Sequence, residues 1–368
     1  MSWAIFESRI RRTQAEMQGL GIDLFVAGAS SNLFYLTGYP PRGDERLLAL
    51  VLPREGEPFF IANLLYRLQV ERLPVKEQLY WADGQDPYGL LKSAVEARGF
   101  KTGKVALEAS LPARFALAIQ QALKGSSFLL GDALTENQRL IKDESELSAI
   151  RRASAGADEA LRAVLKRGRA WIGETERAFS DALTAEMRAL GLEAYGALIA
   201  VGAGAAEPHH RTGETKIEDG SCLLADFGGR VEGYCSDITR TVHFGKPCPE
   251  FERVYGIVLE AHLRAEAAAR PGGILGEVDD AAREYIAGQG YGEAFTHRLG
   301  HGIGLDVHEG PSAVRGEKTV IRPGMVFSNE PGIYLPGRFG VRIENLLAIG
   351  QSGAEALNRF PRELVVIG

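Results

Sequence analysis

Apolar residues follow two alternating patterns through the first third of the chain. Residues 6–20 carry apolar side chains at helical spacing up to Gly21, which predicts a helix that ends there. Short apolar runs at 23–28, 47–52 and 58–62 each predict a strand. The polar stretch PREGE between the last two runs suits the turn of a hairpin.

A further strand and a further helix complete this region. The run KVALEAS at 104–110 predicts a strand, and residues 112–123 predict the helix that follows it. Helices and strands that alternate over this length are typical of an α/β domain. We therefore predict an N-terminal α/β domain over residues 1–140, with its boundary in the stretch TENQRLIKDE.

From Glu144 onward the pattern changes to long amphipathic helices and glycine-containing strands. The predicted helices are 145–168, 174–191, 249–269 and 276–288, and the predicted strand regions are 196–203, 221–244, 325–334 and 340–349. This change of pattern indicates a second domain over residues 141–368.

The composition limits what the chain can be. With 45% hydrophobic and 24% charged residues in a length of 368, the chain can form two packed domains. A net charge of −6 argues against a surface for nucleic acid or an anionic membrane, which needs clustered Lys and Arg. We therefore expect no nucleic-acid partner and no membrane contact.

The lack of a recognisable targeting signal and the pattern of cysteines favour a cytoplasmic location. The stretch MSWAIFESRIRRTQAEM lacks an apolar core of signal-peptide length, and no later stretch is long enough to span a bilayer. Cys222, Cys235 and Cys248 are odd in number and show no C-x-x-C spacing. This favours a reducing compartment and argues against a zinc-ribbon site.

Three of the seven histidines lie in one glycine-rich stretch, HRLGHGIGLDVHEGP at 297–311. His297 and His301 lie four apart, as in the helical zinc motif H-E-x-x-H, but Arg298 stands where that motif has its glutamate. The alternating glycines also make a regular helix unfavourable. If these histidines bind a metal, the other ligands must come from other segments.

Two predicted hairpins could supply those ligands. LLADFGGRVEGYCSDITRTV predicts a turn centred on Val231 and Glu232. That centring places Asp226 directly opposite Asp237. Cross-strand partners have Cβ atoms about 5 Å apart, so two carboxylates would meet there.

The second hairpin shows the same arrangement. FSNEPGIYLPGRFGVRIENLLAI predicts a turn centred on Gly337, which places Glu330 opposite Glu344. Taken alone, either hairpin is better explained by ordinary turn chemistry. Together the hairpins offer four carboxylates in apolar strands, where an unpaired charge is very costly. Four negative charges and one histidine match two divalent cations, and so many oxygen ligands favour Mn²⁺.

Six stretches of the chain match one known family. They are DFGGRVEGYCSDITRT, HRLGHGIGLDVHEGP, NEPGIY and VRIEN, with EPHH (207–210) and SNLFYLTGY (31–39) as weaker matches. On these stretches the chain resembles the pita-bread metallopeptidases, which include Xaa-Pro dipeptidase (prolidase), aminopeptidase P and methionine aminopeptidase. The resemblance implies a creatinase-like α/β domain over 1–140 and an α+β pita-bread catalytic domain over 141–368.

The resemblance also implies a site for two divalent metal ions per subunit. Its ligands would be Asp226, Asp237, His301, Glu330 and Glu344. Asp237 and Glu344 would each contact both ions. Mn²⁺ is the expected ion, and Co²⁺ and Zn²⁺ are the alternatives.

Further residues take roles in catalysis by the same resemblance. Glu330 would accept the proton of the attacking water, and His308 and His209 would stabilise the carbonyl oxygen. His297 and Arg342 fall where the family has substrate-binding residues. The other histidines are interpreted as solvated or core residues: His210, His243 and His262.

The reaction implied by the resemblance is hydrolysis of Xaa-Pro bonds, with dipeptides as the expected substrates. Such a bond is a tertiary amide without an N–H, so a protease that binds substrates as an added strand loses a hydrogen bond there. Aminopeptidase P, which cuts longer Xaa-Pro peptides, is the alternative. A non-catalytic pita-bread binding protein is an alternative of another class, although five intact ligands favour catalysis. Relatives are commonly dimers, so we expect a homodimer.

An arginine could select dipeptides by binding the free carboxylate that follows proline. The stretch GYPPRGDERLLALV (38–51) carries Arg42 and Arg46 just before a predicted strand. We favour Arg46, because it lies next to the strand. The alternative is that both arginines pair with Asp44 and Glu45 on an exposed loop.

Overall fold

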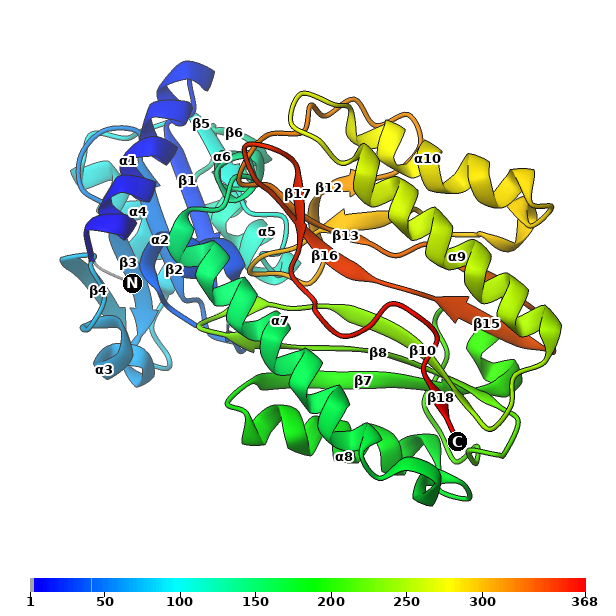
Figure 1. Ribbon diagram of the computed structural model, residues 1–368. Helices are drawn as coiled ribbons and strands as arrows, with labels where there is room; N and C mark the ends of the chain where they lie inside the picture. Colours follow the sequence, from blue (N-terminus) through cyan, green and yellow to red (C-terminus); the bar gives the residue numbers. More distant parts are fainter. Residues whose placement is uncertain (1–2, 41) are drawn as a thin grey trace. The chain divides into compact units, whose positions relative to one another are not determined.

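The computed structural model describes residues 3–40 and 42–368, which divide into two compact units (Figure 1). The first unit is Met1–Arg139 and the second is Leu140–Gly368. Each unit has a hydrophobic core of its own.

The first unit is built on a six-stranded sheet in the order β4-β3-β2-β1-β5-β6. Its strands are β1 (Leu24–Gly28), β2 (Ala49–Pro53), β3 (Phe59–Asn63), β4 (Glu77–Trp81), β5 (Lys104–Leu107) and β6 (Ser127–Leu130). Its helices are α1 (Trp3–Leu20), α2 (Ser31–Thr37), α3 (Arg67–Val70), α4 (Pro87–Ala97), α5 (Ala113–Ala122) and α6 (Ala133–Arg139), with the 3-10 turn η1 (Leu64–Tyr66). All five residues of β1 are buried, as expected for a central strand covered on both faces.

The elements predicted for this unit are found, and others join them. Helix α1 ends one residue before Gly21, whose φ of 64° suits a residue without a side chain. The strands β2 and β3 form the antiparallel hairpin that the PREGE turn predicted. The pattern missed β4 and β6, because these edge strands are mostly half-buried or exposed and lack a continuous apolar run.

The second unit contains three sheets and four long helices. Its helices are α7 (Glu144–Leu165), α8 (Glu176–Ala189), α9 (Pro249–Ala268) and α10 (Leu275–Gly288), with the 3-10 turns η2 (Gly168–Trp171), η3 (Gly202–Ala206) and η4 (Gly292–Ala294). Its strands are β7 (Glu193–Val201), β8 (Cys222–Val231), β9 (Tyr234–Cys235), β10 (Ile238–Phe244), β11 (Gly300–Gly302), β12 (Glu309–Ala313), β13 (Val326–Asn329), β14 (Gly332–Leu335), β15 (Phe339–Arg342), β16 (Asn345–Ile349), β17 (Ala354–Ala356) and β18 (Val366–Ile367). None of the described helices is both long and apolar enough to cross a membrane.

The helices of the second unit pack in pairs on different strands. Helices α7 and α8 share a core with β7, β8 and β10, to which Leu161 and Phe179 contribute. Helices α9 and α10 share another core with β13 and β16, to which Val258 and Val278 contribute. In Figure 1 the strands of this unit lie between the two helix pairs. The segments that carry the candidate ligands therefore run through the middle of the unit.

The first carboxylate hairpin has a different register from the predicted one. Val231 pairs with Tyr234, so the turn is Glu232–Gly233, one position later than predicted. Both turn residues have positive φ, 52° and 86°, which is the conformation of a tight two-residue hairpin turn. Thus Asp226 pairs with Thr239 and not with Asp237. Because the shift between partners is two residues, Asp226 and Asp237 still lie on the same face.

The second hairpin has the predicted register. Gly337 has a φ of 72° at the centre of the turn, and Leu335 pairs with Phe339 across it. Beyond β14 and β15 the same register continues between β13 and β16. Glu330 and Glu344 lie in the short gap between these two ladders, on opposite strands, as predicted.

Candidate metal centre

Three buried side chains from separate segments converge in the second unit. Asp237 precedes β10, His301 lies in β11 and Glu344 lies between β15 and β16. One ligand atom of each lies within 4.8 Å of those of the other two. Carboxylate oxygens with one imidazole are a donor set suited to a divalent cation.

Glu330 lies beside this group. His301 Nε2 is 3.3 Å from Glu330 Oε1 and 3.8 Å from Asp237 Oδ2. The other ring nitrogen of His301, Nδ1, lies 3.1 Å from the carbonyl oxygen of Gly302, to which an Nδ1–H donates. In that tautomer Nε2 keeps its lone pair toward the carboxylates, as a metal-binding histidine requires.

Two hydroxyl groups that the sequence analysis missed orient these side chains. Ser328 Oγ accepts a hydrogen bond from the backbone N–H of His301 and donates one to Glu330 Oε1, each at 3.0 Å. Thr239 Oγ1 donates to Glu344 Oε2 at 2.7 Å. Ser328 precedes Glu330 by two positions, and Thr239 follows Asp237 by two. The alternation of side chains along a strand could therefore have revealed both.

Asp226 is held by Arg342, which is 3% exposed. The guanidinium group donates to Asp226 Oδ2 at 2.6 Å, to Thr239 Oγ1 at 3.1 Å and to Tyr334 Oη at 2.9 Å. Arg342 thus joins β8, β10 and β14. Asp226 is half-buried, and it lies outside the group of three that could share one ion.

The acidic side chains lack sufficient positive charge around them. Burial raises the pKa of Asp237 well above its usual range, and the negative charge of Asp226 raises it further. The pKa of Glu344 is likewise raised, first by burial and then by Asp237. Glu344 Oε1 is also buried without a hydrogen-bond partner among the described residues. Divalent cations would supply the missing charge and occupy that oxygen, so these residues fit a metal site.

Glu330 and His301 form an ion pair in this protein. Burial raises the pKa of Glu330, but the hydrogen bond and charge of His301 and the charge of Arg342 outweigh it and bring the pKa to about 2. Burial lowers the pKa of His301, but Glu330 outweighs it and the pKa is raised. A bound cation would take the place of the imidazolium proton.

The glycines around His301 allow the backbone to approach its neighbours closely. A Cβ atom on Gly300 would lie 1.9 Å from a carbonyl oxygen of β13, and one on Gly302 would lie 2.2 Å from that of Gly310. On Gly304 it would lie 2.6 Å from the carboxylate of Glu309. The stretch forms strand β11 and a bend, which confirms that it is not a helix.

His308 lies against the metal-binding group. Its ring is perpendicular to that of His301, with centroids 4.2 Å apart. It is exposed, and its ring forms no hydrogen bond within residues 3–40 and 42–368. Loss of hydration and the positive charge of His301 lower the pKa of His308. Both ring nitrogens of His308 are therefore open to a ligand.

His297 is engaged by protein groups at both ring nitrogens. Nδ1 lies 2.6 Å from the carbonyl oxygen of Arg298, and Nε2 lies 2.7 Å from Tyr334 Oη. Because Tyr334 Oη accepts from Arg342, its own hydrogen is free to donate to His297 Nε2. Burial lowers the pKa of His297, which favours this neutral form. Here the ring supports Tyr334 and Arg342.

His209 is not joined to the other candidate residues. It is exposed in the turn after η3 and forms no hydrogen bond or ion pair with the described part of the chain. The next residue, His210, lies 3.0 Å from a carboxylate oxygen of Glu176, which is fully buried. Glu176 also accepts from the N–H groups of Val201 and Gly213. This carboxylate therefore fixes the loop that carries His209.

Arg46 belongs to the first unit, and its guanidinium group is occupied there. Nε and Nη2 donate to the two carboxylate oxygens of Asp83, each at 2.9 Å. The side chain also pairs with Asp44 and Glu45. The pairs with Asp44 and Glu45 are those expected if Arg46 only pairs with its acidic neighbours on the loop, and Asp83 is a further partner.

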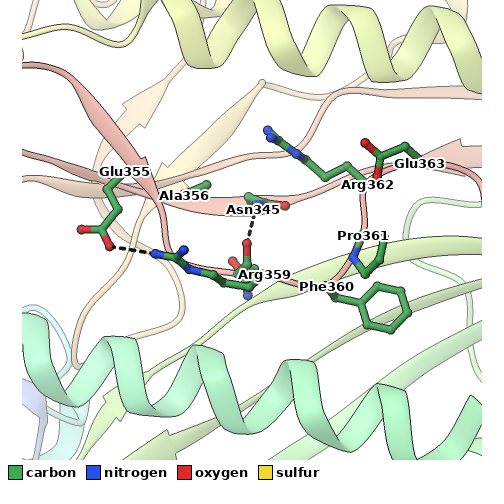
Figure 2. A pocket seen from close by; sticks show the side chains of 9 residues that line it. Asn345, Glu355, Ala356, Arg359, Phe360, Pro361, Arg362 and Glu363 are labelled. Carbon is green, nitrogen blue, oxygen red and sulfur yellow. Dashed lines mark hydrogen bonds and ion pairs between the residues drawn. The ribbon is translucent and has the colours of Figure 1, made fainter.

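A surface pocket near the C-terminus lies close in sequence to Glu344, but none of the candidate metal ligands lines it (Figure 2). It is lined by Asn345 and by residues 355–363 without Leu357. Asn345 follows Glu344, and successive side chains of a strand point to opposite faces. Asn345 donates to the carbonyl oxygen of Asn358, and Arg359 pairs with Glu355 at 3.5 Å. These contacts hold the C-terminal segment.

The chain matches two family models that together span most of its length. A model of metallopeptidase family M24 matches residues 148–351. The chain belongs to this family. A model of the creatinase/prolidase N-terminal domain matches residues 9–141 of the same M24 peptidase. The predicted family and fold class are thereby confirmed.

Similar proteins cover the M24 peptidase almost completely. The Xaa-Pro dipeptidase of Pyrococcus horikoshii is 32% identical over 98% of this chain and 99% of its own. The crystal structure of a prolidase from Thermococcus sibiricus has a TM-score of 0.93 and 35% identity, over 98% of this chain and 99% of its own. An X-Pro aminopeptidase from Thermotoga maritima has a TM-score of 0.84 and 32% identity, over 96% and 100%.

Proposed function

We propose that this M24 peptidase is a prolidase that hydrolyses Xaa-Pro dipeptides with the help of two divalent metal ions. The observation that carries the proposal is the buried group of Asp237, His301 and Glu344, with Glu330 beside it. It stands in a chain that is similar over its full length to an Xaa-Pro dipeptidase.

The metal ions would be held by five side chains: Asp226, Asp237, His301, Glu330 and Glu344. Asp237 and Glu344 are the two that would contact both ions. When bound, the ions acidify water and polarise the scissile carbonyl. We propose Mn²⁺ because four of the five ligands are carboxylates, with Co²⁺ and Zn²⁺ as alternatives.

The chain's own groups would move the proton and stabilise the developing charge. Glu330 accepts a proton from the attacking water and delivers it to the proline nitrogen, which leaves as a secondary amine. The open ring of His308 donates to the carbonyl oxygen as charge develops on it, and His209 is proposed as a second donor. Arg342 and His297 shape the substrate site around Tyr334.

A comparison of two substrates tests the proposal. Rates on Ala-Pro and Ala-Pro-Ala are measured with the same purified protein and the same Mn²⁺ concentration. A prolidase hydrolyses Ala-Pro faster. Faster hydrolysis of Ala-Pro-Ala would favour an aminopeptidase P, which the likeness to the Thermotoga maritima enzyme supports. Bound metal without hydrolysis of either peptide would identify a binding protein.

Arg46 is the proposed group for the free carboxylate of a dipeptide, and this role requires it to leave Asp83. Arg46→Ala should then raise KM for Ala-Pro and increase the relative rate on Ala-Pro-Ala. Asp83→Asn, which weakens the competing pair, should lower KM for Ala-Pro. If neither variant changes the preference between the two peptides, Arg46 is a structural residue of the first unit.

We further propose that the protein is a cytoplasmic homodimer. The three cysteines, Cys222, Cys235 and Cys248, are all free thiols, which supports a reducing compartment. Light scattering coupled to gel filtration measures the mass of the assembly, and a mass of one chain would contradict the dimer.

A further inference from the structure

Arg298 carries a positive charge beside the candidate metal centre without a carboxylate partner. Its Nη1 donates to Ser312 Oγ at 2.9 Å, and it forms no ion pair among the residues that the structure describes. Three other arginines on neighbouring elements each bind a carboxylate: Arg342 binds Asp226, Arg283 binds Asp279 and Arg315 binds Asp280. A guanidinium group has five N–H donors, so Arg298 has donors left for an anion from outside the chain.

The strand pairing places this guanidinium group next to the metal-binding histidine. Ser312, to which Arg298 donates, is the cross-strand partner of His301. Such partners have Cβ atoms about 4.5–5.5 Å apart, with their side chains on the same face. The charge of Arg298 also acts on His308, whose pKa is lowered first by burial, then by His301 and then by Arg298. Arg298 therefore lies near the proposed donor to the carbonyl oxygen.

The backbone that carries Arg298 is held by the next residue. The N–H of Leu299 donates to Asp279 Oδ1 at 2.9 Å, and its carbonyl oxygen accepts from the N–H of Glu330, also at 2.9 Å. Arg298 thus extends from a backbone that is joined to a proposed metal ligand, and its side chain is half-buried. A side chain that is already ordered loses less conformational entropy when it binds a ligand.

An Xaa-Pro dipeptide has a carboxylate very close to the bond that is cut. The carboxylate carbon of its proline is three covalent bonds from the scissile carbonyl carbon, and hence at most about 4.3 Å from it. A side chain that binds this carboxylate must therefore lie near the side chain that binds the carbonyl oxygen. In a longer peptide the same carboxyl group is an uncharged amide. A cation at this place therefore distinguishes the two kinds of substrate.

We propose that Arg298 binds the free carboxylate of the dipeptide and so favours dipeptides over longer peptides. The inference rests on the proposed function, because it takes His308 as the group at the carbonyl oxygen and an Xaa-Pro dipeptide as the substrate. It differs from the proposed role of Arg46, which must first leave Asp83. Arg298 has no carboxylate to leave. A carboxylate has about four acceptor sites, so both arginines can bind it.

Two substrates that differ only in this carboxylate test the proposal. Rates on Ala-Pro and on Ala-Pro amide are measured at the same Mn²⁺ concentration, and the wild-type protein should prefer Ala-Pro. Arg298→Met should lower kcat/KM on Ala-Pro about 10- to 100-fold, mainly through KM, as is typical when a charged hydrogen-bond partner is removed. The rate on Ala-Pro amide should stay nearly unchanged. Arg298→Lys keeps the charge without the two parallel donors, so it should lose less than Arg298→Met.

Binding without turnover separates this inference from the proposed function. Calorimetric titration of Ala-Pro and of Ala-Pro amide into EDTA-treated protein measures the two affinities when no hydrolysis takes place. The wild-type protein should bind Ala-Pro more tightly than the amide, and Arg298→Met should bind the two equally. If the wild-type protein cleaves no Xaa-Pro peptide but shows this preference, the proposed function fails and Arg298 is still a carboxylate-binding residue.

Arg315 offers a matched control close to β12. It pairs with Asp280 and Glu284, and its side chain is 55% exposed, so Arg315→Met should leave both rates unchanged. Metal analysis should give two ions in both methionine variants. The proposal is wrong if Arg298→Met keeps the wild-type preference for Ala-Pro, if it lowers both rates equally, or if the wild-type protein binds neither peptide. Should Arg298→Met not fold, the same ratio measured for Arg298→Lys decides the question.

Discussion

Asp237 and Glu344 carry the largest share of the negative charge that no protein group neutralises. Burial raises the pKa values of both, and nearby carboxylates raise them further, Asp226 first for Asp237 and Asp237 first for Glu344, so cations would bind there most strongly. We expect Asp237→Ala and Glu344→Ala each to release at least one metal ion. Activity on Ala-Pro should fall by more than the roughly 10- to 100-fold loss that is typical when a residue that only orients a metal ligand is mutated. Metal analysis and steady-state rates measure both effects.

His308 provides the contrasting variant. His308→Ala should keep both ions and lose most of kcat, because its ring lies beside His301 and is not itself a proposed ligand. Loss of metal in His308→Ala would show that its ring is a ligand. Full activity with two ions in Glu344→Ala would contradict the proposed site.

His262 makes the stability of the protein dependent on pH. It is fully buried in α9, and burial lowers its pKa to about 3, assisted by the positive charges of Arg240 and Arg362. In the unfolded chain a histidine titrates near pH 6.5, so between about 6.5 and 3 the unfolded state binds the extra proton. The free energy of unfolding should therefore fall by about 1.4 kcal/mol per pH unit as the pH decreases through this window.

The variant His262→Gln isolates this contribution. The variant has no group that titrates in this window at position 262, so its unfolding free energy should fall less steeply between pH 6.5 and 5. Urea denaturation at a series of pH values measures the difference. Equal slopes for the two proteins would show that His262 becomes protonated in the folded state.

At the scale of elements, the turn between β8 and β9 determines where the first carboxylate pair lies. Gly233 has a φ of 86°, where a side chain costs about 1–2 kcal/mol. Gly233→Ala should lower the free energy of unfolding by about that amount. Gly256 is the matched control, because it lies inside α9 with nothing within 4 Å of an added Cβ. Gly256→Ala should raise stability by up to about 1 kcal/mol, as measured by thermal unfolding.

The two hairpins show how far local pattern determines register. In the second, Gly337 marks the turn, and its position alone predicted the pairing that is found. In the first, the prediction placed Val231 in the turn in place of Gly233, whereas both turn positions have positive φ, which suits glycine and disfavours a β-branched residue. Asp226 and Asp237 still lie on the same face, because a shift of two between partners preserves the alternation of side chains.

At the scale of the whole molecule, the metal ions should contribute to stability in a pH-dependent way. Because the pKa values of Asp237 and Glu344 are raised, the metal-free folded protein holds protons that the unfolded chain releases above about pH 4. The stability that these groups give the metal-free protein is therefore lost as the pH rises. Bound cations remove this penalty, and ligand binding adds its own stabilisation.

We therefore expect the Tm difference between Mn²⁺-loaded and EDTA-treated protein to be larger at pH 8 than at pH 5.5. Scanning calorimetry of the two forms measures it, and taking the difference at each pH cancels groups such as His262 that both forms share. A difference that stays constant or shrinks with rising pH would show that these carboxyls are not the groups the metal ions neutralise.

The sequence by itself predicted the long helices of the second unit, most of the central strands, the family and the candidate ligands. Apolar periodicity and glycine positions are local, so α1 and the second hairpin could be predicted from neighbouring residues. The pairing of Glu330 with Glu344 followed from hairpin geometry, which also involves only nearby positions, whereas the predicted pairing of Asp226 with Asp237 was wrong. The edge strands were missed, because β4 is mostly half-buried and β6 mostly exposed, and neither carries a continuous apolar run.

Only the tertiary structure decided which partners each candidate residue has. Arg342 binds Asp226 across 116 positions, and His301 and Ser328 meet across 27. Lys142 reaches Glu309 from a segment that no local pattern connects with His308. Such contacts depend on how distant strands pack around a shared core, and neither spacing nor composition records that arrangement. The sequence therefore determined which groups are available for the chemistry, whereas packing determined which neighbours orient them and set their charge.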